Sequence, residues 1–389
     1  MKKACIFLPI LFLVWANVSF GFVTTAKTAL VVDNTTGDVL LSKDIHRPIP
    51  PASMSKLMTL WMVFEALEKD RLSLQEKLIV SRRAWKKGGS KMFLRQGEKV
   101  TIENLIRGVI IQSGNDACIV LAEGLGGTEE NFAELMTIRA KEIGLEHSNF
   151  SNSTGWPDPK QKMSSSDLLL LAEKIRTQFP EYYKIFKEIE FTWDGITQKN
   201  RNPLLAMKLG VDGLKTGYTE EAGYGLIASA KQGKRRISFI ITGLKSTGQR
   251  AREAKGITTW AFRHFKLHSL FEKNENIVNA PIWLGTKKTI ELASPVETRF
   301  LTPRNPNDLI SAKIILDGEI VAPIKKGQPI KGRLVIETKP LKSENTSTRK
   351  LFFPLIANET VKKGGFTIRV RTNFLSIKKH IFDLFRVKE

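Results

Sequence analysis

The sequence predicts an α+β protein, in which an antiparallel sheet flanked by helices is followed by a small all-β domain and a C-terminal amphipathic helix. Apolar patterns with helical spacing fill much of residues 53–175, whereas β-rich runs gather near residue 240. Past about Leu270 the helical patterns stop, and short alternating runs are separated by Pro and Gly. A chain of 389 residues is long enough for two domains.

The N-terminus is typical of a secretory signal peptide. Lys2 and Lys3 precede an apolar stretch at residues 6–14, which is too short to span a bilayer comfortably. Small residues follow, up to Gly21. We therefore expect residues 1–21 to be cleaved during export, with an uncleaved membrane anchor as the alternative.

The composition, with 42% hydrophobic and 26% charged residues, is ordinary for a globular protein. The formal net charge of +22 is not ordinary. It indicates either a solvated basic surface or an anionic partner such as membrane lipid, cell-wall polymer or nucleic acid. Export argues against nucleic acid and favours an anionic surface of the cell envelope. Cys118 is then the single cysteine of the mature chain, so we expect no internal disulfide and a small buried side chain on a helix.

The first domain is expected to span residues 22–268. A β-hairpin is predicted around the polar turn at residues 33–38, and the apolar residues of 53–67 predict a helix buried in the middle of the domain. Two β-rich runs near residue 240 predict a second hairpin, with Lys215-Thr216-Gly217 on the neighbouring strand. Further helices are predicted at residues 102–111, 116–125, 132–143 and 168–175.

The C-terminal part is predicted to contain two further units. Residues 269–370 are expected to form the β-rich domain, and residues 371–389 an amphipathic helix that lies on an anionic membrane surface. A helix docked on its own domain is the alternative. The helix prediction rests on apolar residues at three- and four-residue steps, which are Phe374, Ile377, Ile381, Leu384 and Phe385.

Three short polar motifs bring together the groups needed for attack on a carbonyl next to a carboxylate. They are Ser53-Met54-Ser55-Lys56, Ser113-Gly114-Asn115 and Lys215-Thr216-Gly217. None of the five histidines lies in a motif, and no pattern suggests a metal or a cofactor. The sequence therefore favours a serine nucleophile that works without histidine.

Serine is a weak nucleophile until a base takes its proton, and Lys56 lies on the same face of the predicted helix as Ser53, one turn on. A lysine acts as a base only when it is neutral, which burial and a second cation such as Lys215 favour. We expect Lys215 to stay charged, Ser113 to relay the proton to the leaving amine, and Asn115 to hold Lys56 and the substrate. Thr216 and Gly217 suit a strand edge that pairs with an extended peptide, and the missing side chain of Gly217 is expected to let the substrate approach.

At these residues the chain resembles the D-alanyl-D-alanine carboxypeptidases, the low-molecular-mass penicillin-binding proteins. The resemblance extends over essentially the whole chain, and it includes the segments around the motifs and part of the β-rich domain. The segments are residues 51–59, 108–117, 211–219 and 322–328. It implies the domain fold shared by serine β-lactamases and DD-peptidases.

The resemblance implies that Ser53 attacks the bond between two D-alanines of a peptidoglycan stem peptide, and that water then hydrolyses the acyl-enzyme. It places the backbone N–H groups of Ser53 and Tyr218 in the oxyanion hole and Arg201 near the site. Arg250 would meet the substrate carboxylate together with Lys215 and Thr216. β-Lactam antibiotics are expected to acylate the same serine, and the expected location is the periplasmic face of the inner membrane.

Other functions remain open at this point. A serine β-lactamase would share the fold and the motifs, but the segment after Asn149 lacks the Glu-x-x-Leu-Asn pattern of a group that activates the deacylating water. An endopeptidase that cuts cross-links differs only in substrate. A non-catalytic envelope scaffold would have no need for intact Ser53, Lys56, Ser113 and Lys215.

Overall fold

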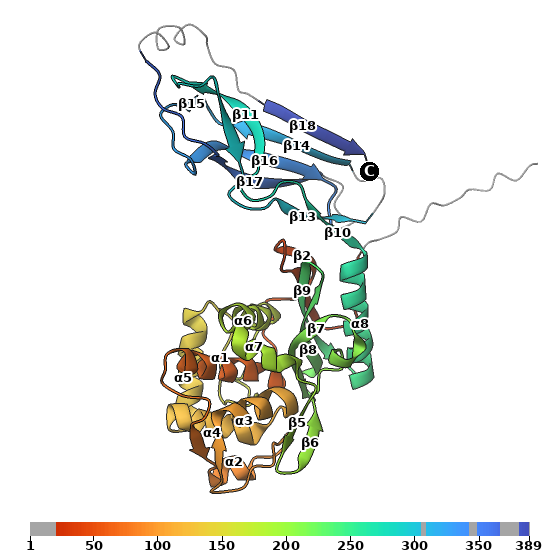
Figure 1. Ribbon diagram of the computed structural model, residues 1–389. Helices are drawn as coiled ribbons and strands as arrows, with labels where there is room; N and C mark the ends of the chain where they lie inside the picture. Colours follow the sequence, from red (N-terminus) through yellow and green to blue (C-terminus); the bar gives the residue numbers. More distant parts are fainter. Residues whose placement is uncertain (1–20, 305–308, 342–347, 366–380, 389) are drawn as a thin grey trace, which may run out of the picture.

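A computed structural model of the chain describes residues 21–304, 309–341, 348–365 and 381–388 (Figure 1). Nearly all of the predicted signal peptide lies outside these residues. Figure 1 shows a mixed domain of helices and strands, and a second, β-rich domain beyond the end of α8 (Thr247–Arg263). The predicted α+β class and the order of the two domains are thus confirmed.

The first domain is built on a five-stranded antiparallel sheet with the order β2-β1-β9-β8-β7. Both predicted hairpins are present, and the strand with Lys215 lies beside the second hairpin at one edge of the sheet. An edge strand has backbone groups that are free to pair with an extended peptide. The strands are β1 (Thr28–Asp33), β2 (Asp38–Lys43), β7 (Val211–Thr219), β8 (Gly223–Gln232) and β9 (Arg235–Leu244).

Helices cover both faces of this sheet. On one face α8 packs on β8 and β9, and on the other α6 packs on β1 and β9. The predicted central helix, α1, is buried along almost its whole length. The helices of the first domain, besides α8, are α1 (Lys56–Glu68), α2 (Arg82–Lys86), α3 (Ile102–Arg107), α4 (Asn115–Gly126), α5 (Glu129–Glu142), α6 (Ser165–Gln178) and α7 (Pro180–Tyr183).

Shorter elements complete the domain. Two of them matter for the site: the 3-10 turn η1 (Ala52–Ser55) leads directly into α1, and the π-helical turn η2 (Gly108–Gln112) extends α3. The others are β3 (Lys77–Ile79) with β4 (Lys99–Thr101), β5 (Glu190–Trp193) with β6 (Ile196–Lys199), and the turns η3 (Lys184–Lys187) and η4 (Leu205–Met207).

The second domain consists of strands in the described residues. A seven-stranded sheet has the order β15-β11-β12-β17-β16-β14-β18, and β10 pairs with β13 beside the first domain. The predicted boundary at residue 268 falls inside β10. The strands are β10 (Phe265–Ser269), β11 (Asn276–Trp283), β12 (Thr289–Ala293), β13 (Arg299–Pro303), β14 (Leu309–Leu316), β15 (Ile320–Val321), β16 (Pro329–Thr338), β17 (Arg349–Ala357) and β18 (Ile381–Lys388).

Charged side chains join the two domains. Arg235 of β9 pairs with the fully buried Asp33 and also donates a hydrogen bond of 3.1 Å to the carbonyl of Phe265. From the second domain, Arg349 pairs with Asp38 of the N-terminal hairpin. Breaking one partner of a buried ion pair costs about 3–5 kcal/mol, so Asp33 holds Arg235 firmly in the position from which it reaches Phe265.

The predicted C-terminal helix is wrong over its last eight described residues. Residues 381–388 form β18, which pairs antiparallel with β14, while Phe374 and Ile377 lie outside the described residues. Without β18, β14 would lie at the sheet edge with unpaired backbone groups. The β-branched and aromatic residues of 381–388 favour a strand, which pairs with those groups. Among the residues described, no helix is long and apolar enough to cross a membrane.

Candidate active site

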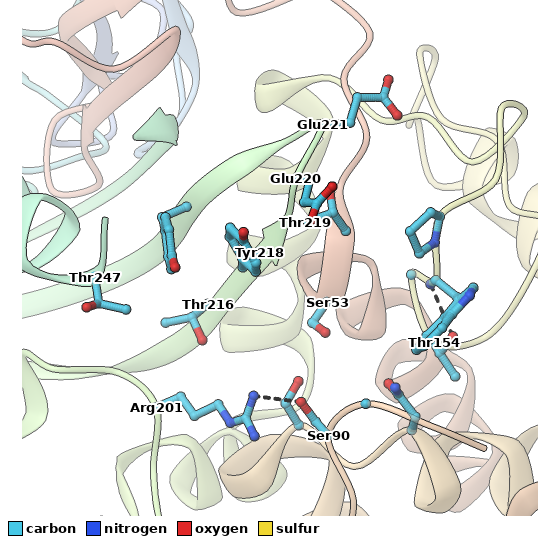
Figure 2. Close-up of a pocket in the computed structure, with 18 of the residues that line it drawn as sticks. Ser53, Ser90, Thr154, Arg201, Thr216, Tyr218, Thr219, Glu220, Glu221 and Thr247 are labelled. Carbon is cyan, nitrogen blue, oxygen red and sulfur yellow. Dashed lines mark hydrogen bonds between the residues drawn. The ribbon is translucent and has the colours of Figure 1, made fainter. Parts of the chain in front are cut away.

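A cleft of about 900 Å³ opens beside β7, and Figure 2 shows Ser53 in the middle of the residues that line it. The structure brings all the predicted site residues together. Eight of them line the cleft, and the other two, Lys56 and Lys215, lie buried just beneath it. The predicted residues that line the cleft are Ser53, Ser113, Asn115, Arg201, Thr216, Gly217, Tyr218 and Arg250.

The Ser53 turn is held in an uncommon backbone conformation. Ala52 has a φ of +49°, in the left-handed region that residues with a Cβ rarely adopt, and its side chain is 2% exposed. The 3-10 turn that follows places Ser53 one turn before Lys56, the first residue of α1. Strain of this kind persists only where the surroundings enforce it, and here it fixes the position of the serine hydroxyl.

Lys56 is the centre of the hydrogen-bond network. Its Nζ atom donates to Ser53 Oγ over 3.0 Å, to Asn115 Oδ1 over 2.8 Å, and to the backbone carbonyl of Thr154. Burial, with smaller contributions from the charges of Arg201 and Lys87, lowers the pKa of Lys56 from 10.5 to about 8, against the opposing effects of Cys118 and Asp116. A useful fraction of Lys56 is therefore neutral near pH 7–8, as a general base requires.

The second motif occupies a tight bend between two helices. The turn η2 ends at Ser113, which has a φ of +63°, and α4 begins at Asn115. Asn115 also donates to the carbonyl of Gly88 over 2.8 Å, so its amide is fixed on both sides. Ser113 Oγ is buried and has no hydrogen-bond partner in the structure, so its hydroxyl is available to a bound substrate.

The third motif lies on β7 and faces the Ser53 turn. Lys215 and Thr216 are buried, and a Cβ added at Gly217 would lie 3.1 Å from Met54 Cγ and from the carbonyl oxygen of Pro51. The missing side chain of Gly217 allows the strand to pack closely against the serine turn. Gly217 also lines the cleft, where we expect the substrate to approach the strand.

Burial of Lys215 weakens the preference for the charged form that we expect of this lysine. Burial lowers its pKa well below 10.5, and the charges of Lys56 and Arg201 lower it further. Desolvation also lowers the pKa of Arg201 and of Arg250. Lys215, Arg201 and Arg250 place several basic groups at one end of the cleft, and no carboxylate of the described residues contributes to their pKa shifts. Such an arrangement favours a ligand with a negative charge.

The two arginines come from different elements. Arg201 precedes β7 and donates to Ser90 Oγ over 2.6 Å, the contact drawn in Figure 2. Arg250 lies in α8 with its guanidinium 5.7 Å from the centre of the Tyr224 ring, and its buried Nε atom has no hydrogen-bond partner among the described residues. An unpartnered buried donor on the cleft wall indicates that its acceptor comes with the ligand.

Comparison with known proteins identifies the family. A sequence profile of the D-alanyl-D-alanine carboxypeptidases matches residues 19–246, and a profile of the C-terminal domain of penicillin-binding protein 5 matches residues 265–363. The chain belongs to the D-alanyl-D-alanine carboxypeptidase family.

Relatives and solved structures agree with this assignment. The carboxypeptidase DacC of Escherichia coli is 36% identical, over 91% of this chain and 88% of the relative, and DacF of Bacillus subtilis is 34% identical over 88% and 87%. The crystal structure of penicillin-binding protein 5 from Haemophilus influenzae aligns with a TM-score of 0.73 at 32% identity, covering 87% of this chain and 98% of that one. The ampicillin-bound structure of penicillin-binding protein D2 from Listeria monocytogenes aligns with a TM-score of 0.57 at 28% identity, over 62% and 99%.

One part of the site in this family member was missed at the sequence level. Residues 154–157 form a cleft wall, and Asn152 Oδ1 holds this loop by accepting from the backbone N–H groups of Thr154, Gly155 and Trp156 at 2.8–3.1 Å. Gly155 has a φ of +76°, and a Cβ there would overlap the carbonyl of Ala52. Several polar residues followed by Gly and Pro indicate a turn, but nothing in that pattern shows that the Thr154 carbonyl contacts a lysine.

Proposed function

We propose that this carboxypeptidase-family protein removes the terminal D-alanine from peptidoglycan stem pentapeptides through an acyl-enzyme on Ser53. The observation that carries the proposal is the 3.0 Å contact between Ser53 Oγ and the buried amine of Lys56, inside an open cleft. A nucleophile and a base within hydrogen-bond distance are the minimum for this chemistry. The complex of a structural relative with ampicillin supports β-lactams as ligands of the same serine.

In the first step, neutral Lys56 takes the proton of Ser53 as Oγ bonds to the carbonyl carbon of the penultimate D-alanine. The carbonyl oxygen becomes negative, and the backbone N–H groups of Ser53 and Tyr218 stabilise it. The C–N bond then breaks, and the leaving amine receives a proton, with the unpartnered hydroxyl of Ser113 as the relay. Water finally attacks the ester and restores Ser53.

The cationic end of the cleft recognises the free carboxylate of the terminal D-alanine. Thr216 and Arg250 line this end, and Lys215 lies beneath it. A bound carboxylate supplies the counter-charge that Lys215 lacks in the resting site, and it raises the pKa of that lysine. Lys215 is thus charged when substrate is present, while Lys56 remains the base.

The test is the release of D-alanine from a stem-pentapeptide mimic by residues 22–389. Ser53→Ala is expected to abolish release, whereas Ser73→Ala, at an exposed serine that does not line the cleft, leaves it intact. Labelling by a fluorescent penicillin should follow the same pattern. A folded wild type that releases no D-alanine, but cleaves a cross-linked peptide dimer, would replace this proposal with an endopeptidase.

We further propose that the protein is exported and associates with the anionic surface of the membrane through its C-terminal segment. The support is the net charge of +22, the N-terminal signal pattern, and the basic residues of 371–389, and no longer a helix at residues 381–388. Sedimentation with anionic vesicles is expected for residues 22–389 and not for residues 22–365. Equal sedimentation of both would contradict this.

A further inference from the structure

The cleft carries opposite charges at its two ends. Arg201 and Thr247 lie at one end in Figure 2, Glu220 and Glu221 lie at the other, and Ser53 and Tyr218 lie between them. The buried Nε of Arg250, at the cationic end, has no hydrogen-bond partner within the part of the chain that the structure describes. The cationic end is accounted for by the substrate carboxylate, whereas the proposed reaction leaves the acidic end without a role.

The edge strand β7 fixes the direction in which a peptide crosses the cleft. A substrate whose carboxylate meets Thr216 and Arg250 can pair with β7 only if its preceding residues extend toward Thr219, which is the antiparallel direction. The parallel direction would place the carboxylate beside Glu220, where the charges repel. The residues that precede the scissile bond therefore extend toward the acidic end.

The distances available match the residue that precedes the two D-alanines. Adjacent residues of a strand are about 3.3 Å apart, so two residues upstream correspond to about 7 Å along β7. Starting at Gly217, this reaches Thr219, next to Glu220. A long side chain on that substrate residue meets the two carboxylates.

The charges around the acidic end are unequal. Glu221 is paired with Lys162 at 3.0 Å, whereas Glu220 is exposed and has no ion pair or hydrogen bond in the described residues. On the loop wall, Lys87 already lies 4.5 Å from the centre of the Trp156 ring. The positive charge of Lys87 repels a cationic substrate side chain from Trp156, so that side chain is directed toward Glu220.

We propose that Glu220, with Glu221 beside it, selects substrates whose residue before the two D-alanines carries a side-chain ammonium group. This inference rests on the proposed carboxypeptidase function and extends it to the third residue of the stem peptide. The contact is exposed, so its effect on kcat/KM is moderate, about threefold.

The experiment compares two peptides of the form acetyl-X-D-Ala-D-Ala, in which X is lysine or Nε-acetyl-lysine. For the wild type, kcat/KM is expected to be about threefold higher with lysine, and 1 M salt should remove most of this ratio. Glu220→Gln is expected to bring the ratio near one, and Glu220→Lys to bring it below one. Glu134→Gln, at an exposed glutamate of α5, should leave it unchanged.

The ratio is measured within each variant, so a general loss of activity cancels. A wild-type ratio near one, or a ratio that survives Glu220→Lys, would overturn the proposed selection while D-alanine release still upholds the carboxypeptidase function. No release from either peptide by folded wild type would overturn both.

Discussion

Lys56 donates a hydrogen bond of 3.0 Å from its Nζ atom to Oγ of Ser53. The donor is the first residue of α1 and the acceptor lies in the 3-10 turn before it, so local backbone geometry alone sets the pair. Asn115 and the carbonyl of Thr154 then hold the amine from two other segments. The base is thus held by the adjacent serine turn and by two distant parts of the chain, and its protonation should control the reaction.

We expect kcat/KM for D-alanine release to rise with pH up to an inflection near 8. Below this pKa, Lys56 is mostly protonated and cannot accept the serine proton, so the rate should rise about tenfold per pH unit. Lys87 helps to lower the pKa of Lys56, so Lys87→Gln should move the inflection upward. Lys86→Gln, which changes the exposed neighbour of Lys87, should leave the inflection where it is. A flat pH profile between pH 6 and 9 would refute the role of Lys56 as the general base.

Ser113→Ala should reduce kcat/KM by about 10²–10⁴ without loss of stability, because its buried hydroxyl has no partner to lose. Ser164→Ala is the matched control. That hydroxyl is equally buried but accepts from the N–H of Asp167 at the start of α6, so the variant should lose about 1 kcal/mol and keep its activity. Penicillin acylation kinetics and thermal unfolding measure the two effects.

Lys215→Met should abolish D-alanine release and raise the free energy of unfolding at pH 7 by about 1 kcal/mol or more, because it removes a buried amine that lost its hydration on folding. Burial depresses the pKa of Lys215 below its unfolded value of 10.5. The unfolded state therefore binds more protons, and wild-type stability should gain from Lys215 as pH rises toward 10.5. Denaturant unfolding at pH 7 and 10 should show that this gain is smaller in the variant; an equal gain would contradict the assignment.

Asn152→Ala should release the loop that presents the Thr154 carbonyl to Lys56. One Oδ1 atom accepts three backbone N–H groups there, so the variant should lower both kcat/KM, about tenfold, and the unfolding midpoint. Asn152→Asp retains the oxygen and should recover most of the activity. If the alanine variant matched the wild type, the loop would have no part in holding the base.

Much of the site followed from local sequence. The spacing of Ser53 and Lys56 on one helical turn predicts their contact, and the β-rich runs near residue 240 predict the strand that carries Lys215. Ser53, Lys56 and Lys215 could be recognised because their side chains carry the chemistry. The Thr154 carbonyl could not be found in this way, because every residue has a backbone carbonyl and only the tertiary fold decides which one meets the lysine.

The C-terminal segment shows a different limit. Ile381, Leu384 and Phe385 fit helical spacing, yet the same segment is rich in residues that favour strands. In so short a segment, the spacing of apolar residues alone does not distinguish a helix from a strand. The open edge of β14 decides it, and that edge exists only once the sheet has formed.

Gly155 limits how this cleft can evolve. Any larger residue there would force the Ala52 carbonyl, and with it the serine turn, out of place. Substitutions at position 155 are therefore unavailable as a route to evade an antibiotic. Adaptive variation should gather instead at the exposed rim, where Trp156, Tyr218 and Glu220 can change without moving the nucleophile.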